Sequence, residues 1–129
     1  MPQDHGQGVE WYRKAAEQGR ADAQFNLGVS YDNGRGVPQD HAQAAAWYRK
    51  SAEQGDSRAL NNLGVLYIKG NGVKVDYIEA YKWIYLATKR GSRDAGRNLD
   101  QLTLFMKAEQ IAEASKKATA MEHQFADKQ

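Results

Sequence analysis

Histidines are the side chains of this sequence best suited to bind a metal ion or transfer a proton. His5 and His41 are 36 residues apart, and His123 lies near the C-terminus. No two of them have the i, i+4 spacing that brings a histidine pair onto one face of a helix as metal ligands. We therefore expect no metal site, and we interpret these histidines as solvated side chains at helix starts and in the tail.

Two glycine-containing segments are candidates for a phosphate-binding loop, namely Gly34-Arg35-Gly36 and Gly70-Asn71-Gly72. Both are too short for the G-x-G-x-x-G fingerprint, and both follow predicted helices rather than strands, so we interpret them as turns. No serine occupies a G-x-S-x-G elbow. The absence of cysteine excludes disulfides, thiolate zinc ligands and a cysteine nucleophile. The sequence predicts a non-catalytic protein with no cofactor.

A repeat of 36 residues positions all of these groups. The segment WYRKAAEQG at 11–19 returns as WYRKSAEQG at 47–55 and, much altered, as WIYLATKRG at 83–91. AQFNLGVSYDNGRGV at 23–37 likewise becomes ALNNLGVLYIKGNGV at 59–73. A fixed period of this length is typical of a solenoid, in which each unit buries its apolar face against its neighbours. A binding surface is therefore the leading functional hypothesis.

Each repeat predicts two helices. Asp40 with Gln43, and Asp76 with Glu79, have the spacing of a capping box at the start of the first helix. Three glycines stand where that helix needs a left-handed residue to end: Gly19, Gly55 and Gly91.

Glycines recur inside the second helix, at Gly28 and Gly64, where each costs about 1 kcal/mol relative to alanine. That cost is explained if two helices approach too closely to admit a Cβ. Large aromatic side chains recur at the same period and are predicted to lie in the core. They are Trp11, Trp47, Trp83, Tyr12 and Tyr48.

Composition limits the remaining possibilities. At 129 residues, with a net charge of +2 and 26% charged residues, the chain is predicted to form one soluble domain without a nucleic-acid-binding basic stripe. It has no apolar run of about 18 residues that would span a bilayer, and no signal peptide is expected within it. Met1 aligns with Val37, so we interpret the chain as trimmed from a longer array, with a short natural chain as the alternative.

The pattern A-x-x-x-L-G-x-x-Y-x-x-G-x-G-V, followed by a cap aspartate and W-Y-x-K-x-A-E-Q-G, resembles the Sel1-like repeat (SLR), a relative of the tetratricopeptide repeat. The resemblance covers Pro2 to about Leu104. It implies an all-α, right-handed α-α superhelical solenoid of 36-residue helix pairs that docks other proteins, often in bacterial adaptor, secreted or envelope-associated proteins. It is not known as an enzyme fold. Periplasmic, secreted and cytoplasmic locations are all compatible with it, so the localisation stays unknown.

Two regions are predicted. Residues 1–105 form an SLR array of about three units, of which the first starts mid-repeat and the last is degenerate, because Asp100 replaces the interior glycine. Residues 106–129 form an amphipathic capping helix with a loose C-terminus near residues 126–129. A partner-binding or dimerising helix is the alternative. Its predicted apolar stripe is Leu104, Ala108, Ile111, Ser115, Ala118, Met121 and Phe125.

The resemblance also implies that the second helix of each pair lines a concave groove, where an asparagine hydrogen-bonds the backbone of an extended peptide. An amide offers both donors and an acceptor for this purpose, and two arginines could clamp a carboxylate bidentately. The predicted partner-binding residues are Asn26, Asn62, Asn98, Phe25, Val29, Arg58, Asn61, Val65 and Arg97. The alternative is that these asparagines tie neighbouring helices together and that the charges form a solvated face.

The predicted partner is another protein or a peptide, and two other classes of ligand stay open. Carbohydrate or cell-wall binding, or an enzyme on the same scaffold, would need exposed aromatic platforms or paired carboxylates, and Phe25 is the only aromatic expected in the groove. RNA binding would need a repeated basic code, but Asp22 and Arg58 occupy equivalent positions. No membrane span is expected. Self-association is possible through the C-terminal helix or an exposed N-terminal half-repeat.

Overall fold

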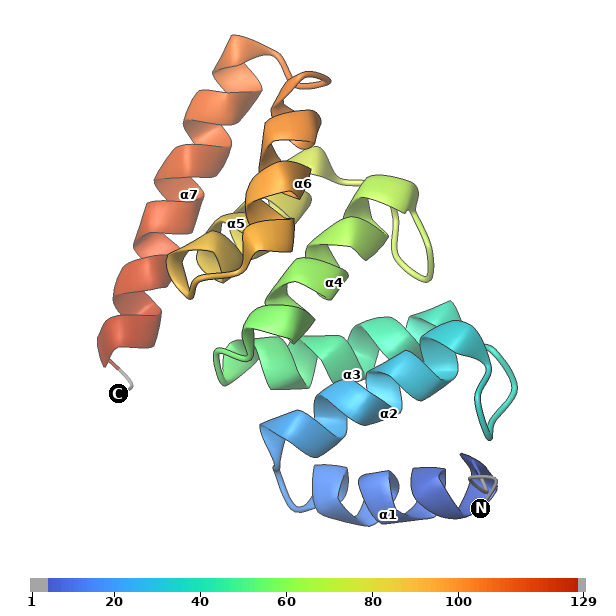
Figure 1. Cartoon of the computed structure of the whole chain (residues 1–129). Helices are drawn as coiled ribbons and strands as arrows, with labels where there is room; N and C mark the ends of the chain where they lie inside the picture. The colour runs from blue at the N-terminus through green and yellow to red at the C-terminus, as the bar shows by residue number, and fades with distance from the viewer. Residues whose placement is uncertain (1–4, 128–129) are drawn as a thin grey trace.

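The computed structural model describes the backbone of residues 5–127 and the side chains of residues 8–125. Within this part the chain forms seven α-helices and no strand (Figure 1). They are α1 (His5–Glu17), α2 (Ala21–Asn33), α3 (His41–Glu53), α4 (Ser57–Lys69), α5 (Tyr77–Lys89), α6 (Arg93–Thr103) and α7 (Ala108–Asp127). The predicted all-α fold is confirmed. None of the described helices is both long and apolar enough to cross a membrane.

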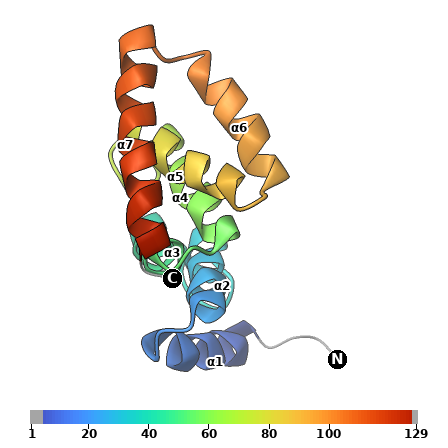
Figure 2. The same ribbon diagram turned by 90° about the vertical axis from the view of Figure 1, so that its left-hand side faces the viewer.

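Successive helices stack into an elongated array. The most extensive contacts join the second helix of one pair to the first helix of the next, which are α2 with α3 and α4 with α5. Figure 2 shows the stack from the side, with α1 at one end and with α6 and α7 on opposite sides of α5 at the other. This arrangement is the predicted α-α solenoid.

Aspartate caps fix the starts of the repeated helices. The side chain of Asp40 accepts from the N–H of Gln43 at 3.1 Å, and that of Asp76 accepts from the N–H of Glu79 at 3.0 Å. A full capping box would return the N–H of Asp40 to Gln43, but this N–H donates instead to the carbonyl of Tyr31 at 2.8 Å. The caps thus also hold the connector against the helix that precedes it. They do so because the glycine-containing loop turns the chain back on itself.

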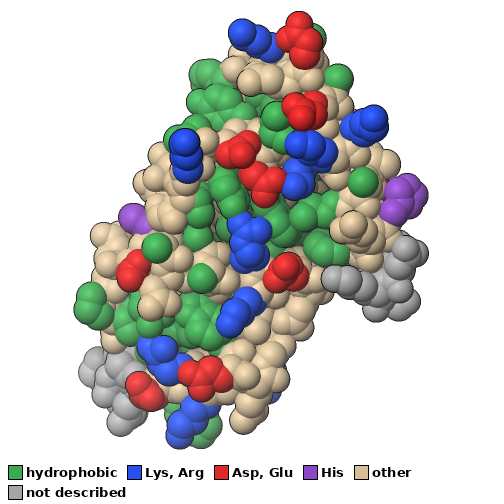
Figure 3. Space-filling view, turned by 180° about the vertical axis from the view of Figure 1, so that it is seen from behind, with side chains coloured by type: hydrophobic (Ala, Val, Ile, Leu, Met, Phe, Trp, Pro, Cys, Tyr) green, Lys and Arg blue, Asp and Glu red, His purple; other side chains and the backbone are tan. Residues whose placement is uncertain are grey.

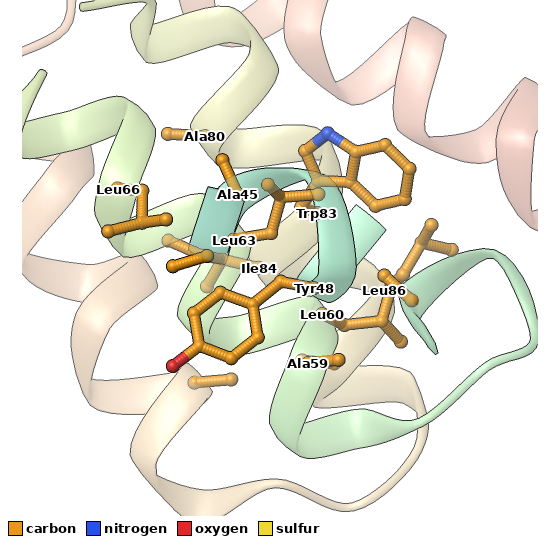
Figure 4. Packing of buried hydrophobic residues seen from close by; sticks show 14 of the residues in the cluster. Ala45, Tyr48, Ala59, Leu60, Leu63, Leu66, Ala80, Trp83, Ile84 and Leu86 are labelled. Atoms are coloured by element: carbon orange, nitrogen blue, oxygen red, sulfur yellow. The ribbon is translucent and has the colours of Figure 1, made fainter. Parts of the chain in front are cut away.

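The interior glycines lie against large side chains of the next helix. A Cβ added at Gly28 would come within 2.5 Å of Cδ1 of Tyr48, and one at Gly64 would overlap the side chain of Ile84. Tyr48 and Ile84 are both buried, and Figure 4 shows them within the packed core beside Leu63. The prediction that these glycines mark close helix contacts is confirmed.

The predicted burial of the repeated tryptophans is right at one end of the array and wrong at the other. Trp83 is buried and Trp47 is half-buried, but Trp11 is 74% exposed. The reason is the number of neighbours, since α5 packs on α4, α6 and α7, whereas α1 packs chiefly on α2. A side chain at the same repeat position is therefore covered on α5 and open on α1.

Helix α7 leaves the repeat pattern and packs along α5. Ala114 and Ala118 are fully buried in this contact, with Ile111, Met121 and Phe125 half-buried around them.

The predicted stripe was wrong at Leu104, which is 82% exposed, and at Ala108, which is also exposed. Leu104 lies in the turn between α6 and α7, so the helical spacing does not continue through it, and Ala114 was missed for the same reason. The division at residue 105 and the capping role of this helix stay predictions. Of the predicted loose end, residues 128–129 lie outside the described residues, and α7 includes Asp127.

The glycine contacts predict opposite effects of one substitution at two sites. Gly64→Ala should lower the free energy of unfolding by about 1–3 kcal/mol, because the new methyl group overpacks the contact with Ile84. Gly96→Ala in α6 should raise it by up to about 1 kcal/mol, because a Cβ there meets no atom within 4 Å and alanine favours the helix. Urea denaturation of both variants checks this, and a loss of stability no greater at Gly64 than at Gly96 would contradict it.

Candidate interaction surface

The predicted partner-binding residues occupy three successive second helices. Phe25, Asn26 and Val29 lie on α2, and Arg97 and Asn98 on α6. The remaining four, all on α4, are Arg58, Asn61, Asn62 and Val65. All are half-buried except the two arginines, which are exposed. We refer to the residues on α2 and α4 together as the α2–α4 surface.

Arg58 joins the two helices of this surface. Its guanidinium lies 4.2 Å from the centre of the Phe25 ring, which is close enough for a cation–π interaction. The same group donates to the carboxylate of Asp56, with an Nη2–Oδ2 distance of 3.0 Å. Asp56 also caps α4. Nε of Arg58 donates to Oδ1 of the same carboxylate at 3.3 Å. The carboxylate and the ring therefore hold the guanidinium in one position, although the Arg58 side chain is 54% exposed.

The asparagines of this surface do not all have the same surroundings. Nδ2 of Asn98 donates to Oδ1 of Asn61 at 2.9 Å, which ties α6 to α4. The Asn62 side chain lies near the hydroxyl of Tyr48 on α3. These contacts favour, for Asn98, Asn61 and Asn62, the alternative that asparagines link neighbouring helices. The side chain of Asn26 is half-buried at the surface of α2.

Arg97 stands apart from Arg58. It forms an ion pair with Asp94 one turn earlier on α6, and both side chains are 74% exposed. An exposed pair of this kind contributes little to stability and is screened by salt. The structure thus places Arg58 in a fixed position and leaves Arg97 on a solvated helix face.

A hollow of about 330 Å³ opens at the other end of the α2–α4 surface. Asn62 and Val65 belong to the predicted set and line it, but most of its wall was missed. The lining residues are Asp32, Asn33, Gln39, His41, Asn62, Val65, Leu66, Lys69 and Asn71. One signal for it existed in the sequence, because Asp32 and His41 depart from Ile68 and Tyr77 at the equivalent positions.

Asp32 is the centre of a hydrogen-bond network in this wall. Nδ1 of His41 lies 2.8 Å from Oδ1 of Asp32, and the hydroxyl of Tyr48 donates to Oδ2 at 3.2 Å. His41 was predicted to be a solvated side chain, but it is half-buried here because the connector returns the start of α3 to the end of α2. Burial and the nearby Asp32 carboxylate both raise the pKa of Tyr48 above its usual value, so its hydroxyl stays a donor.

The wall of the hollow therefore presents both hydrogen-bond donors and hydrogen-bond acceptors in fixed positions. Among the described residues, no three His, Cys, Asp or Glu side chains come together in a way that could hold a metal ion. What the arrangement can do is recognise a polar ligand.

Comparison with known sequences settles the family. The sequence model of the Sel1 repeat matches residues 1–19, 21–56 and 57–92. The chain belongs to the Sel1 repeat family. Proteins built from Sel1 repeats are typically protein-interaction scaffolds. No curated protein sequence matches the chain significantly.

Solved Sel1 structures share this arrangement of helices. A protective antigen of uropathogenic Escherichia coli, c5321, displays an SLR fold and superposes on 99% of this chain with a TM-score of 0.93 and 35% identity. A Sel1 repeat protein from Oxalobacter formigenes covers 77% of the chain, with a TM-score of 0.73 and 39% identity. Cysteine-rich protein B of Helicobacter pylori covers 70%, with a TM-score of 0.67 and 31% identity.

These relatives differ from this Sel1 chain in length and in chemistry. The chain spans 28% of the E. coli protein, 41% of the Oxalobacter protein and 68% of the Helicobacter protein. The Helicobacter protein is described as cysteine-rich, whereas this chain has no cysteine. No disulfide therefore links its helix pairs.

The raised pKa of Tyr48 makes a testable prediction about alkaline pH. An unfolded tyrosine loses its proton near pH 10, whereas buried Tyr48 keeps it. Above that pH the unfolded state binds fewer protons than the folded state, so the free energy of unfolding falls as pH rises. Tyr48→Phe should remove this dependence, which amounts to about 1.4 kcal/mol per pH unit.

Urea denaturation of both proteins between pH 9 and 12 measures the difference. Other groups that titrate in this range are common to both, so only the difference in slope counts. Equal slopes would show that Tyr48 ionises as freely in the folded chain as in the unfolded one.

Proposed function

We propose that this Sel1 array is a non-catalytic scaffold whose α2–α4 surface binds an extended segment of another protein. The observation that carries this is Arg58, which is fixed over Phe25 with free N–H groups at one end of the surface. The hollow lined by Asn62 and Val65 lies at the other end. Together they provide a charged anchor and a polar recess on one continuous stretch of helix.

The length of this surface fits a short peptide. Arg58 and Lys69 are separated by 11 residues of α4, or about 16 Å along a helix axis. About five residues of extended chain cover that distance. Asn26 lies on α2 within this surface and supplies an amide group of the kind that bonds a peptide backbone.

The charges of the surface indicate the chemistry of the segment. Nε and Nη2 of Arg58 already bond Asp56, so a carboxylate of the ligand would bond the remaining Nη N–H groups, with the ring contact to Phe25 limiting the entropy that binding would cost. The hollow contains both Asp32 and Lys69, so it suits a polar neutral side chain. A peptide with an acidic residue about five positions from a polar one is therefore the ligand that we propose.

Selection of displayed random peptides on the native chain tests this proposal. The selected peptides should be enriched in Asp or Glu, and Arg58→Glu should weaken their binding at least tenfold, because it removes a charge-assisted pair and adds repulsion. Lys116→Glu changes charge equally at an exposed position of α7 and should leave the affinity unchanged.

Asn26→Ala is the second variant and should also weaken binding. It is preferable to Asn62→Ala, because Asn62 lies near the buried Tyr48 hydroxyl and its loss could also affect stability. Failure to select any peptide, or peptides that bind the Arg58→Glu and native chains equally, would refute the proposal.

A further inference from the structure

Two asparagine–glycine steps occur in this chain, and the asparagines of both line the hollow. Asn33 precedes Gly34, and Asn71 precedes Gly72. At such a step the backbone nitrogen of the glycine can attack the asparagine side chain, because glycine has no side chain that obstructs the approach. The two steps have the same covalent chemistry, so any difference in their reactivity comes from the way in which the fold holds them.

The fold protects the first step. Asn33 is the last residue of α2, and the N–H of Gly34 donates to the carbonyl of Ser30. Nδ2 of Asn33 donates to the carbonyl of Val29 at 3.2 Å. Both the attacking nitrogen and the amide that it would attack are thus hydrogen-bonded to the helix. The end of α2 must open before this step can react.

The second step has no such protection. Asn71 lies outside the helices, in the connector between α4 and α5 (Figure 1). Gly72 is exposed, and its N–H has no acceptor among the described residues. Within the same part of the chain, no hydrogen bond like that of Asn33 holds the Asn71 amide. The attacking nitrogen and the amide are therefore both free, and solvent reaches them.

The fold requires the glycine of this step but not the asparagine. Gly72 has a φ of 75°, and a Cβ added to it would come within 2.3 Å of the carbonyl carbon of His41. Another residue at this position would be strained and would overlap the start of α3. Arg35 stands at the position of Asn71 in the preceding connector, so the side chain there is free to vary.

We propose that Asn71 is a site of spontaneous deamidation. The backbone nitrogen of Gly72 bonds to Cγ of Asn71, the Cγ–Nδ2 bond breaks, and ammonia leaves with the proton of the Gly72 N–H. Water then opens the resulting succinimide ring at one of its two carbonyls, which leaves aspartate or isoaspartate at position 71. The reaction consumes only water. Hydroxide removes the Gly72 proton, so the rate rises with pH.

The product adds a carboxylate to the hollow. Asn71 lines it together with Asp32 and Lys69, whose charges oppose each other, so two carboxylates would face one ammonium group after the reaction. One added charge matters less elsewhere, because Figure 3 shows Lys, Arg, Asp and Glu side chains interspersed over the face seen there. The hollow would then suit a basic side chain rather than a neutral one. This consequence rests on the proposed peptide-binding function, whereas the reaction does not.

Mass spectrometry of the trypsin-digested protein measures the reaction at both steps in one experiment. Trypsin cleaves after Arg35 and Lys69, so the two asparagines fall in different peptides. In the folded native chain at mildly alkaline pH, Asn71 should convert at least about tenfold faster than Asn33, which reacts only when α2 opens. In the urea-denatured chain both should react at similar rates, because neither is then protected.

The matched control is Asn71→Arg, which copies the preceding connector. It should keep the stability of the native chain and lose the reaction at position 71. Amide hydrogen exchange gives a second readout that needs no substitution. The N–H of Gly72 should exchange at least about tenfold faster than that of Gly34, which is bonded to α2.

Three results would overturn the proposal. The first is an equal rate at Asn33 and Asn71 in the folded chain. The second is a folded chain in which Asn71 stays intact while the denatured chain reacts. The third is conversion to aspartate without isoaspartate, which would exclude the ring intermediate.

The consequence for binding has its own test. A peptide selected on the native chain, with lysine in place of its polar residue, should bind Asn71→Asp at least about threefold more tightly than the native chain. Equal affinities would show that the new carboxylate does not act on the ligand. Failure to select any peptide would refute the proposed function, whereas mass spectrometry alone decides whether Asn71 deamidates.

Discussion

The contact between an interior glycine and the large side chain that covers it determines how these helices stack. Gly28 lies under Tyr48, and Gly64 lies under Ile84. A helix pays about 1 kcal/mol for such a glycine, so the close approach must return more than that in packing. Because the contact recurs after 36 residues, it packs α3 on α2 and α5 on α4 in the same way and so repeats the stacking along the array.

Hydrogen bonds between the two helices of a pair fix how these helices align along their length. Arg13 donates to the hydroxyl of Tyr31, and Arg49 donates to that of Tyr67 at the next repeat. The third repeat has Tyr85 and Thr103 at these positions, and it also replaces the interior glycine with Asp100. The third repeat therefore lacks the residues that form these contacts in the earlier repeats, and the next helix, α7, packs along α5.

The fold could be predicted from the sequence because the residues that form one helix contact recur after 36 residues. Gly28 and Gly64, with Asp40 and Asp76, mark helix contacts and helix starts that the structure contains. The exposure of Trp11 could not be predicted from its repeat position, because burial depends on the neighbouring helices and not on the residue.

The candidate surface was predictable only in part. Helical spacing placed Phe25 and Arg58 on one side of their helices, but it could not show the cation–π contact between them. The hollow was missed because Asp32 and His41 are replaced by Ile68 and Tyr77 in the next unit, and an analysis based on positions shared by those two units gives such residues no weight. Their meeting depends on the path of the connector, which brings the start of α3 back to the end of α2.

The most direct test of this account is a double-mutant cycle on the second glycine contact. Gly64→Ala and Ile84→Ala should each destabilise the chain, one by overpacking and the other by leaving a cavity. Combined, they should cost at least about 1 kcal/mol less than the sum of the two, because the smaller side chain makes room for the new methyl group. Strictly additive losses would show that Gly64 and Ile84 do not constrain each other and that another interaction sets the spacing of the helices.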